Sequence, residues 1–262
     1  MPFIRVGEIV MHYRFDGPAD APTVVLSNSI GTTLDMWEPN VDALAAHFRV
    51  LRYDTRGHGL SESGADDAGG TTVALLADDV AGLMDALRID RAHFVGLSLG
   101  GMTGQRFAAA HPERVDKLVL CATASKIGEP QFWNDRADAV SAKGMAAIAG
   151  AVQRWFTADA YAERTEIVRG FITMLARADA AGYAACCRAI GRTDLHDDLA
   201  RIRARTLVIS GSDDPATPPA DGESLRDRIA GAQYELIDNA SHQLAAERPD
   251  AVNTLITGFL RA

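Results

Sequence analysis

The chain has 262 residues, of which 47% are hydrophobic and 23% are charged, and its net charge at pH 7 is -9. This composition indicates a globular domain that buries a large core, and the length suits one α/β domain carrying an insertion. The acidic balance disfavours a nucleic-acid surface, and no apolar run approaches the roughly 20 residues of a membrane helix. We therefore expect neither nucleic-acid nor membrane partners.

The start of the chain and its cysteines indicate a cytoplasmic protein. Residues 1–17 lack a basic region followed by an apolar stretch, so we expect no signal peptide. The cysteines Cys121, Cys186 and Cys187 are odd in number, and two of them are adjacent. This pattern suits neither a disulfide framework nor a metal site, and it predicts buried thiols in a reducing compartment. We expect no metal and no organic cofactor.

Short apolar, β-branched runs alternate with helical patterns along most of the chain. Residues 4–17 alternate in polarity and predict an antiparallel hairpin at a sheet edge. Helical spacing follows at residues 76–87 and again before His111. Further strands are predicted over residues 23–27, 48–54, 92–98, 117–123, 206–212 and 234–239. The alternation predicts the α/β class, with a mostly parallel sheet and helices on both faces.

One region interrupts this alternation. Residues 125–199 contain no predicted strand, and apolar residues such as Ile167 and Phe171 recur there at helical spacing. We interpret this region as a helical cap inserted over the carboxyl end of the sheet. The core then comprises residues 1–124 and 200–262.

The stretch Gly96-Leu97-Ser98-Leu99-Gly100 follows a predicted strand and precedes a helical pattern. That context is typical of a nucleophile elbow, a strained turn that lifts a serine hydroxyl above the sheet. Side chains two residues to either side would collide with the adjoining strand and helix, which accounts for both glycines. Ser98 is therefore the candidate nucleophile. The alternative is a glycine-rich turn in which the serine is incidental.

A serine nucleophile needs a base and an orienting acid, which follow it in the order acid, then histidine. Among the histidines after Ser98, His111 precedes a proline at a helix end and suits a cap, and His196 lies in a charged stretch. His242 follows the last predicted strand and is the candidate base. For the acid, Asp214 has the G-x-x-D spacing from Gly211 and is preferred, and its neighbour Asp213 is the alternative.

The oxyanion formed on the substrate carbonyl requires donors that already point at it. The backbone N–H of Leu99, directly after the candidate nucleophile, is one of them. The turn after the strand at residues 23–27 is expected to supply the second. Counting back from Trp37 selects the N–H of Ile30.

The motifs YDTRGHGLS (residues 53–61), the elbow and GSDDPATPP (residues 211–219) resemble the α/β-hydrolase fold, whose pattern covers nearly the whole chain. The resemblance implies that Arg56 binds backbone carbonyls and braces the elbow and the top of the sheet. It also implies that His58 is structural. Most members carry His-Gly in the oxyanion turn, whereas this chain has Asn28-Ser29.

A narrower resemblance is carried by residues 26–37 and by three cap stretches. LSNSIGTTLDMW, ATASKIGEPQFWNDR (residues 122–136), RWFTADAY (154–161) and GYAACCRAI (182–190) are similar to 3-oxoadipate enol-lactonases of the bacterial β-ketoadipate pathway. The resemblance implies a small anionic lactone as substrate, attacked by Ser98 or by water with His242 as base. A positive, forked group should then bind the substrate carboxylate.

Several assignments remain alternatives at this point. Arg136 is the candidate anchor for the carboxylate, with Arg154 and Arg188 as rivals, and a solvated helix arginine is the other interpretation. Trp133 and Trp155 are expected to form an apolar wall, or simply to pack the cap. A broad carboxylesterase or perhydrolase-like enzyme and a non-catalytic binding protein are the rival functions. A dehalogenase is disfavoured, because it would need a carboxylate in place of Ser98. The sequence does not determine the oligomeric state, and a homo-oligomer is compatible with it.

Overall fold

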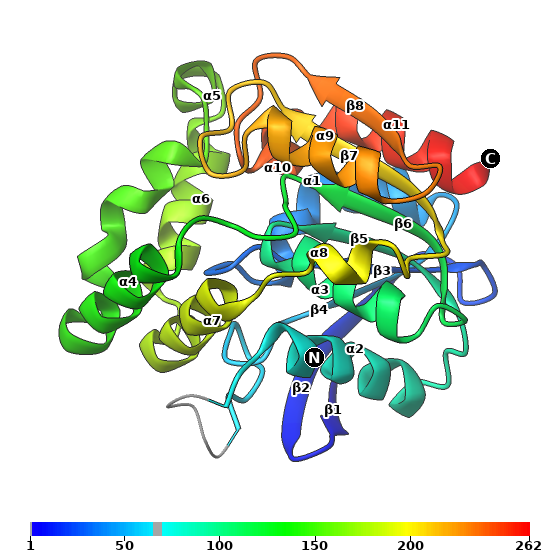
Figure 1. Ribbon diagram of the computed structural model, residues 1–262, viewed down its shortest axis with the longest axis horizontal. Helices are drawn as coiled ribbons and strands as arrows, with labels where there is room; N and C mark the ends of the chain where they lie inside the picture. The colour runs from blue at the N-terminus through cyan, green and yellow to red at the C-terminus, as the bar shows by residue number, and fades with distance from the viewer. Residues whose placement is uncertain (1, 65–69) are drawn as a thin grey trace.

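The computed structural model describes residues 2–64 and 70–262. Within these residues eight strands form one sheet in the order β1-β2-β4-β3-β5-β6-β7-β8 (Figure 1). β1 and β2 pair antiparallel at one edge, β2 pairs antiparallel with β4, and the other neighbours are parallel. The strands are β1 (Phe3–Val6), β2 (Ile9–Asp16), β3 (Thr23–Ser27), β4 (Arg49–Tyr53), β5 (Ala92–Leu97), β6 (Val115–Cys121), β7 (Arg205–Gly211) and β8 (Gln233–Ile237). The predicted α/β class and the edge hairpin are confirmed.

Helices cover both faces of the sheet. Outside the cap they are η1 (Leu34–Trp37), α1 (Glu38–Ala45), α2 (Val73–Ala86), α3 (Leu99–Ala110), α9 (Pro219–Arg228), α10 (Leu244–Glu247) and α11 (Pro249–Arg261). α1 packs against α11 and β4, whereas α2 packs against α3, and α9 packs against β7. In β3, Val24 and Leu26 belong to the core cluster that contains α1 and α11, while Val25 belongs to the cluster beneath α2 and α3. A strand buried on both faces therefore produces the continuous apolar run seen in the sequence.

Five strands, β4 to β8, end one or two residues earlier than the sequence predicted, and a residue of positive φ follows three of them. Ser98 after β5, Ala122 after β6 and Asn239 just beyond β8 have positive φ values of 58°, 42° and 51°. This left-handed conformation turns the chain out of the sheet. The apolar pattern continues past each strand end, so it does not reveal the turn. Each of these turns delivers the chain to the edge of the sheet where the candidate site lies.

The cap (residues 125–199) connects β6 to β7 and consists of α4 (Pro130–Lys143), η2 (Met145–Arg154), α5 (Ala158–Glu163), α6 (Thr165–Ala176), α7 (Ala180–Arg192) and α8 (His196–Leu199). Figure 1 shows α4 to α7 gathered on one side of the sheet. Phe171 and Tyr183 of the cap belong to the same apolar cluster as Leu26 of the sheet. A Cβ on Gly182 would lie 2.2 Å from the carbonyl oxygen of Gly57, so glycine permits the close approach of α7 to the core.

The cysteines do not contribute reactive groups. Cys121, Cys186 and Cys187 are buried thiols, as predicted. Burial raises the pKa of Cys121 and of Cys187 to about 12, so neither forms a thiolate at neutral pH.

In the described part of the chain, none of the helices has the length and apolar character needed to cross a membrane.

Candidate active site

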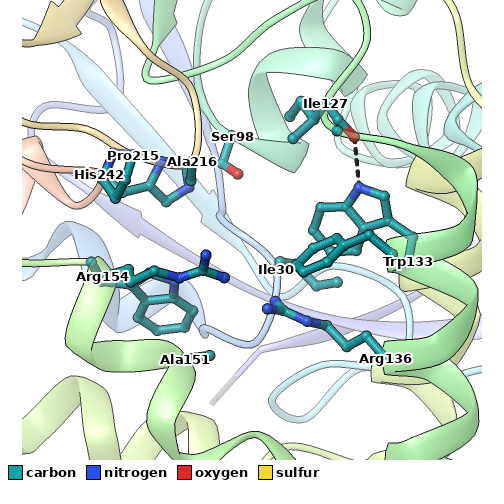
Figure 2. Close-up of a pocket in the computed structure, with 13 residues that line it drawn as sticks. Ile30, Ser98, Ile127, Trp133, Arg136, Ala151, Arg154, Pro215, Ala216 and His242 are labelled. Atoms are coloured by element: carbon teal, nitrogen blue, oxygen red, sulfur yellow. Dashed lines mark hydrogen bonds between the residues drawn. The ribbon is translucent and has the colours of Figure 1, made fainter.

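A cavity of about 230 Å³ lies between the carboxyl ends of the parallel strands and the cap. The core contributes residues that follow β3, β5, β7 and β8, and the cap contributes residues of α4 and η2 and their flanking loops. Figure 2 shows the Ser98 hydroxyl and the His242 ring facing this cavity together with two arginines. It is lined by Ile30, Ser98, Ile127, Gly128, Phe132, Trp133, Arg136, Ala151, Arg154, Trp155, Pro215, Ala216 and His242.

Ser98 occupies a strained turn between β5 and α3. Its φ and ψ are 58° and -116°, an unfavourable conformation for a residue with a side chain. A Cβ on Gly96 would lie 2.2 Å from the carbonyl oxygen of Gly100, and a Cβ on Gly100 would lie 2.2 Å from that of Ser27. Both glycines are therefore required by close backbone contacts. The turn projects the serine from the end of the sheet into the cavity.

Asp214 and His242 are brought together by the loops after β7 and β8. The Nδ1 atom of His242 lies 2.9 Å from Oδ2 of Asp214, and both residues are buried. The carboxylate also accepts hydrogen bonds from the backbone N–H groups of Ala216 (2.8 Å) and Thr217 (3.1 Å) and from the Thr217 hydroxyl (2.6 Å). Asp213, by contrast, is exposed and accepts from the hydroxyl of its neighbour.

The carboxylate of Asp214 is held in its charged form. Burial alone would raise its pKa, but the charge of His242 and the hydrogen bonds from His242 and Thr217 outweigh burial and lower the pKa below its usual value. A charged acceptor at Nδ1 fixes the tautomer of the imidazole, so that Nε2 is the nitrogen available as a base. An oriented base of this kind is one of the parts that activation of a serine nucleophile needs.

Two backbone N–H groups are candidates for binding a developing oxyanion. Leu99 is the first residue of α3, where helix N–H groups lack intrahelical acceptors. The N–H of Ile30, in the turn after β3, donates to no acceptor among the described residues. The neighbouring Asn28 anchors this turn: its amide donates to the carbonyl of Tyr53 (2.7 Å) and accepts from the indole of Trp37 (3.1 Å).

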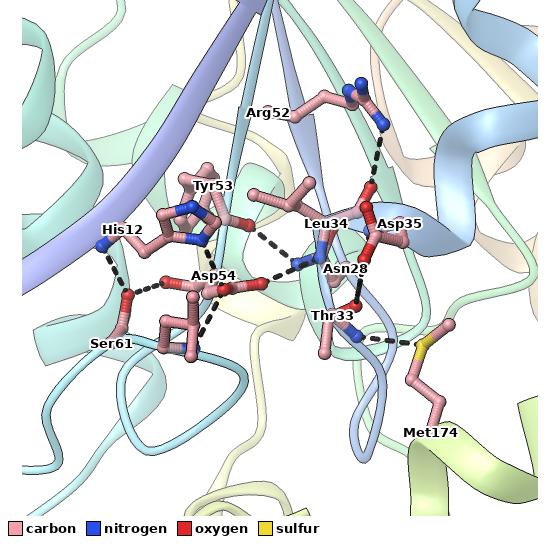
Figure 3. A network of polar contacts seen from close by, with 11 residues as sticks. His12, Asn28, Thr33, Leu34, Asp35, Arg52, Tyr53, Asp54, Ser61 and Met174 are labelled. Atoms are coloured by element: carbon pink, nitrogen blue, oxygen red, sulfur yellow. Dashed lines mark hydrogen bonds and ion pairs between the residues drawn. The ribbon is translucent and has the colours of Figure 1, made fainter. Parts of the chain in front are cut away.

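Asp54 organises the same turn from behind, as Figure 3 shows. Its carboxylate accepts from the backbone N–H groups of Leu34 (2.8 Å) and Leu60 (2.9 Å) and contacts Nδ1 of His12 at 2.8 Å. The N–H of Thr33 also donates to the sulfur of Met174 in α6. The oxyanion turn is therefore bonded to the core on one side and touches the cap on the other.

The expected role of Arg56 holds only in part, because it binds one backbone carbonyl but mainly carboxylates. Its guanidinium forms a paired contact with Asp79 of α2 (2.8 and 2.7 Å) and reaches Glu8, while the backbone carbonyl within its reach is that of Ser63. It therefore ties α2 to the edge hairpin rather than bracing the elbow through carbonyls. His58 donates from Nδ1 to the carbonyl of Arg56 at 3.1 Å, and burial lowers its pKa, which keeps the ring neutral.

Arg136 and Arg154 face the cavity from the cap (Figure 2). Arg136 lies on α4, donates to the hydroxyl of Tyr183 (3.4 Å) and has its guanidinium 4.7 Å from the ring centre of Phe132. Neither arginine forms an ion pair with any carboxylate in residues 2–64 and 70–262. The cavity thus contains two positive groups without a fixed counter-charge. Arg188, the other rival, is paired outside the cavity with Asp138 at 2.7 Å.

Trp133 and Trp155 are buried and line the cavity. The indole of Trp133 donates to the carbonyl of Ile127 at 2.6 Å, which fixes the ring against the loop that enters α4. The two remaining histidine alternatives lie elsewhere. His111 caps the end of α3, where its backbone N–H donates to the carbonyl of Phe107. The ring of His196 contacts Asp194 and Ser125.

Some cavity residues carried no signal in the sequence. Ile127, Phe132 and Ala151 read as ordinary cap residues, and Pro215 and Ala216 read only as neighbours of Asp214. A resemblance to family stretches covers several of them but does not say which side chains face the cavity. For metals, no cluster of three His, Cys, Asp or Glu side chains suited to an ion occurs among the residues that the structure describes.

Comparisons with known proteins agree with this architecture. A family model described as the alpha/beta hydrolase fold matches residues 22–249. Two proteins from Acinetobacter baylyi, 3-oxoadipate enol-lactonase 1 and 2, are 39% and 38% identical to this chain. The alignments cover 95% and 97% of this chain and 92% and 94% of the two relatives.

Solved structures extend the likeness to three dimensions. The enol-lactonase from Burkholderia xenovorans LB400 superposes with a TM-score of 0.96 at 45% identity, and the alignment covers 100% of both chains. Both resemblances predicted from the sequence motifs are thereby confirmed.

Proposed function

The chain belongs to the α/β-hydrolase family, and on that premise we propose that it opens 3-oxoadipate enol-lactone to 3-oxoadipate, a step of aromatic-compound catabolism. The observation that carries the proposal is the pair of unpaired arginines facing the same cavity as the Ser98 hydroxyl. A neutral ester would need no such pair. A small lactone that bears a carboxymethyl group would place its carbonyl at the Ser98 hydroxyl and its carboxylate at the arginines.

In the proposed reaction the Ser98 oxygen attacks the lactone carbonyl while its proton passes to Nε2 of His242. Asp214 stabilises the imidazolium through Nδ1, with which it already forms a 2.9 Å contact. The negative charge on the carbonyl oxygen is stabilised by the N–H groups of Leu99 and Ile30. These donors are part of the backbone, so they need no reorganisation when the charge develops.

Collapse of the tetrahedral intermediate breaks the ring carbon–oxygen bond. The leaving group is an enolate, which is a weaker base than an alkoxide. It takes up the proton held by His242 to become the ketone, which returns His242 to its neutral form. Water then gives a proton to His242 and attacks the acyl-enzyme, releasing 3-oxoadipate and restoring the Ser98 hydroxyl. Direct attack by water with His242 as base gives the same product.

Binding of the substrate carboxylate is assigned to Arg136 and Arg154. The charge-assisted hydrogen bonds of a guanidinium to a carboxylate are strongest where water is partly excluded. Arg136 meets this condition because it is half-buried against Phe132 and Trp133. Trp133 and Trp155 supply the apolar surface against which the lactone ring packs.

The proposal is tested by incubating the purified protein with the enol-lactone and following 3-oxoadipate formation. The Ser98→Ala variant is the control for the nucleophile. We expect turnover by the wild type only. Labelling by a fluorophosphonate together with rapid aryl-ester cleavage, but no lactone opening, would instead identify a general carboxylesterase. Absence of labelling in the folded protein would indicate a binding protein without hydrolytic activity.

A further inference from the structure

The loop that carries His242 is bonded to the cap through its backbone. The N–H of Gln243 donates to the carbonyl of Trp155 at 2.9 Å, and the hydroxyl of Ser241 donates to the carbonyl of Arg154 at 3.1 Å. The residues on either side of the candidate base are therefore bonded to two cap residues that line the cavity. Further contacts are Asn239 with Asp159 (2.7 Å) and Arg164 with the carbonyl of Ala246 (2.9 Å).

Glu247 lies at the centre of this junction. Its side chain is fully buried in the described structure, with 0% of its surface exposed. Oε2 accepts from the backbone N–H of Ser241 at 2.7 Å. Oε1 accepts from the backbone N–H of Thr157 at 2.8 Å and also from the hydroxyl of that residue. One carboxylate thus joins the residue before His242 to the residue two positions after Trp155.

The chemistry of the contacts requires an acceptor on both sides. All three donors are N–H or O–H groups, and no cation forms an ion pair with Glu247 in the part of the chain that the structure describes. A carboxylate accepts at both oxygens, whereas an amide offers one oxygen and one NH₂ group. Whichever way a glutamine side chain turned, its NH₂ would face the N–H of either Ser241 or Thr157.

We propose that Glu247 is a positioning residue that sets the distance between the base His242 and the substrate-binding wall formed by Arg154 and Trp155. This inference rests on the roles assigned to His242 and Arg154 in the proposed function. Glu247 lines no part of the cavity and acts only through Ser241 and Thr157. Glu247 connects the loop that carries His242 to the cap residues that bind the substrate. Its loss therefore affects both the reaction rate and substrate binding.

The test compares Glu247→Gln with wild type in two measurements on the full chain. The first is the second-order rate constant for labelling of Ser98 by a fluorophosphonate, which does not depend on the natural substrate. The second is KM for the enol-lactone. Because misplacing reacting groups by about 1 Å can cost on the order of 100-fold in rate, we expect labelling to slow by about 10- to 100-fold per folded molecule. KM for the lactone should rise in the same variant.

Two further variants separate positioning from stability. Asp198→Asn removes a carboxylate of α8 that pairs with Arg106 and Arg201, and it should lower the melting temperature without changing labelling or KM. Thr157→Val removes the hydroxyl that donates to Glu247 on the cap side, and with it the side-chain cap that accepts from the N–H of Ala160 at the start of α5 (3.3 Å). It should raise KM for the lactone by a few-fold and leave the labelling rate near that of wild type, and it serves as the test should Glu247→Gln fail to fold.

The outcomes are distinct. A Glu247→Gln protein that melts earlier but labels at the wild-type rate and keeps its KM would overturn the proposal, and so would a Thr157→Val protein with unchanged KM if that were the only folded variant. A wild-type protein that is labelled but does not open the lactone would refute the proposed function alone. The labelling comparison would then still decide the role of Glu247.

Discussion

The two walls of the cavity are built in different ways. The sheet wall presents Ser98, His242 and the N–H of Ile30 from turns at strand ends, where backbone contacts leave little freedom. The cap wall presents long side chains, among them Arg136 and Arg154, from helices that join the core by apolar packing and by the hydrogen bonds around Glu247. The groups proposed to carry out the chemistry are therefore fixed by the fold, while the groups proposed to select the substrate are side chains on an inserted element.

This difference means that reactivity and selectivity should respond separately to mutation. A change on the sheet wall should reduce the hydrolysis of every ester, because all esters use the same oxygen, base and oxyanion donors. A change on the cap wall should affect anionic substrates in particular. The junction at Glu247 is the exception, because it contacts both walls.

The largest expected effect is that of Ser98→Ala. By analogy with serine hydrolases, removal of the nucleophile should lower kcat by about 10⁴- to 10⁶-fold while substrate binding persists. Steady-state kinetics and equilibrium binding of the lactone check both parts. Ser212→Ala, which alters a partly exposed serine outside the cavity, is the matched control. Near-normal turnover by Ser98→Ala would show that a group other than Ser98 is the nucleophile.

Gly100→Ala tests whether backbone contact fixes the sheet wall. The added methyl group would lie 2.2 Å from the carbonyl oxygen of Ser27, so β3 and α3 must separate. A displacement of this kind should lower kcat by about 100-fold or more for neutral and anionic esters alike. Gly170→Ala in α6 is the control, because its Cβ meets nothing within 4 Å. That variant should gain about 0.5–1 kcal/mol in the free energy of unfolding and keep its kcat.

Arg154→Leu tests the cap wall. Loss of a charge-assisted hydrogen bond of about 1.5–3 kcal/mol should raise KM for the anionic lactone by about 10- to 100-fold and leave kcat close to wild type. Arg188→Leu, which alters an arginine paired with Asp138 outside the cavity, should change neither constant. Equal effects of the two substitutions would remove Arg154 from the binding site.

The smallest expected effect concerns stability at acid pH. The folded-state pKa of Asp214 is lowered, because the contacts with His242 and Thr217 outweigh burial, so the unfolded chain binds the proton more readily. Its stabilising contribution is complete above the ordinary carboxyl pKa and is lost as pH falls through the folded value. Asp214→Asn should therefore flatten the loss of stability between about pH 5 and pH 3, as measured by urea unfolding. An unchanged slope would contradict the assignment.

Most of the fold could be predicted because burial on both faces produces long apolar runs. β3 was predicted to the residue, and the antiparallel hairpin was evident from its alternation. β5 and β6 were predicted to extend past their observed ends, because a positive φ at Ser98 or Ala122 does not change the hydrophobic pattern of the sequence. The partner of Arg56 was missed because Asp79 lies 23 residues away, on a helix face that reads as solvent-exposed.

The site was less evenly predictable. Its sheet wall follows local rules, since the elbow and the G-x-x-D spacing each lie within a few residues. The cap wall depends on how helices pack, which no local spacing reveals. Arg136 and Arg154 share one cavity although the sequence offered them as rivals. The sequence gives no sign of the role of Glu247, because "LAAERPD" resembles an ordinary exposed helix end, whereas the side chain is fully buried.

The most direct test of the division between the two walls is one ratio of kcat/KM values. It compares the enol-lactone with its neutral methyl ester, in wild type and in the double variant Arg136→Leu with Arg154→Leu. We expect wild type to prefer the anionic lactone strongly. In the double variant, kcat/KM for the lactone should fall while kcat/KM for the methyl ester stays unchanged, so that the preference is lost. A wild-type enzyme that hydrolyses both at equal rates, or a double variant impaired equally on both, would contradict the account.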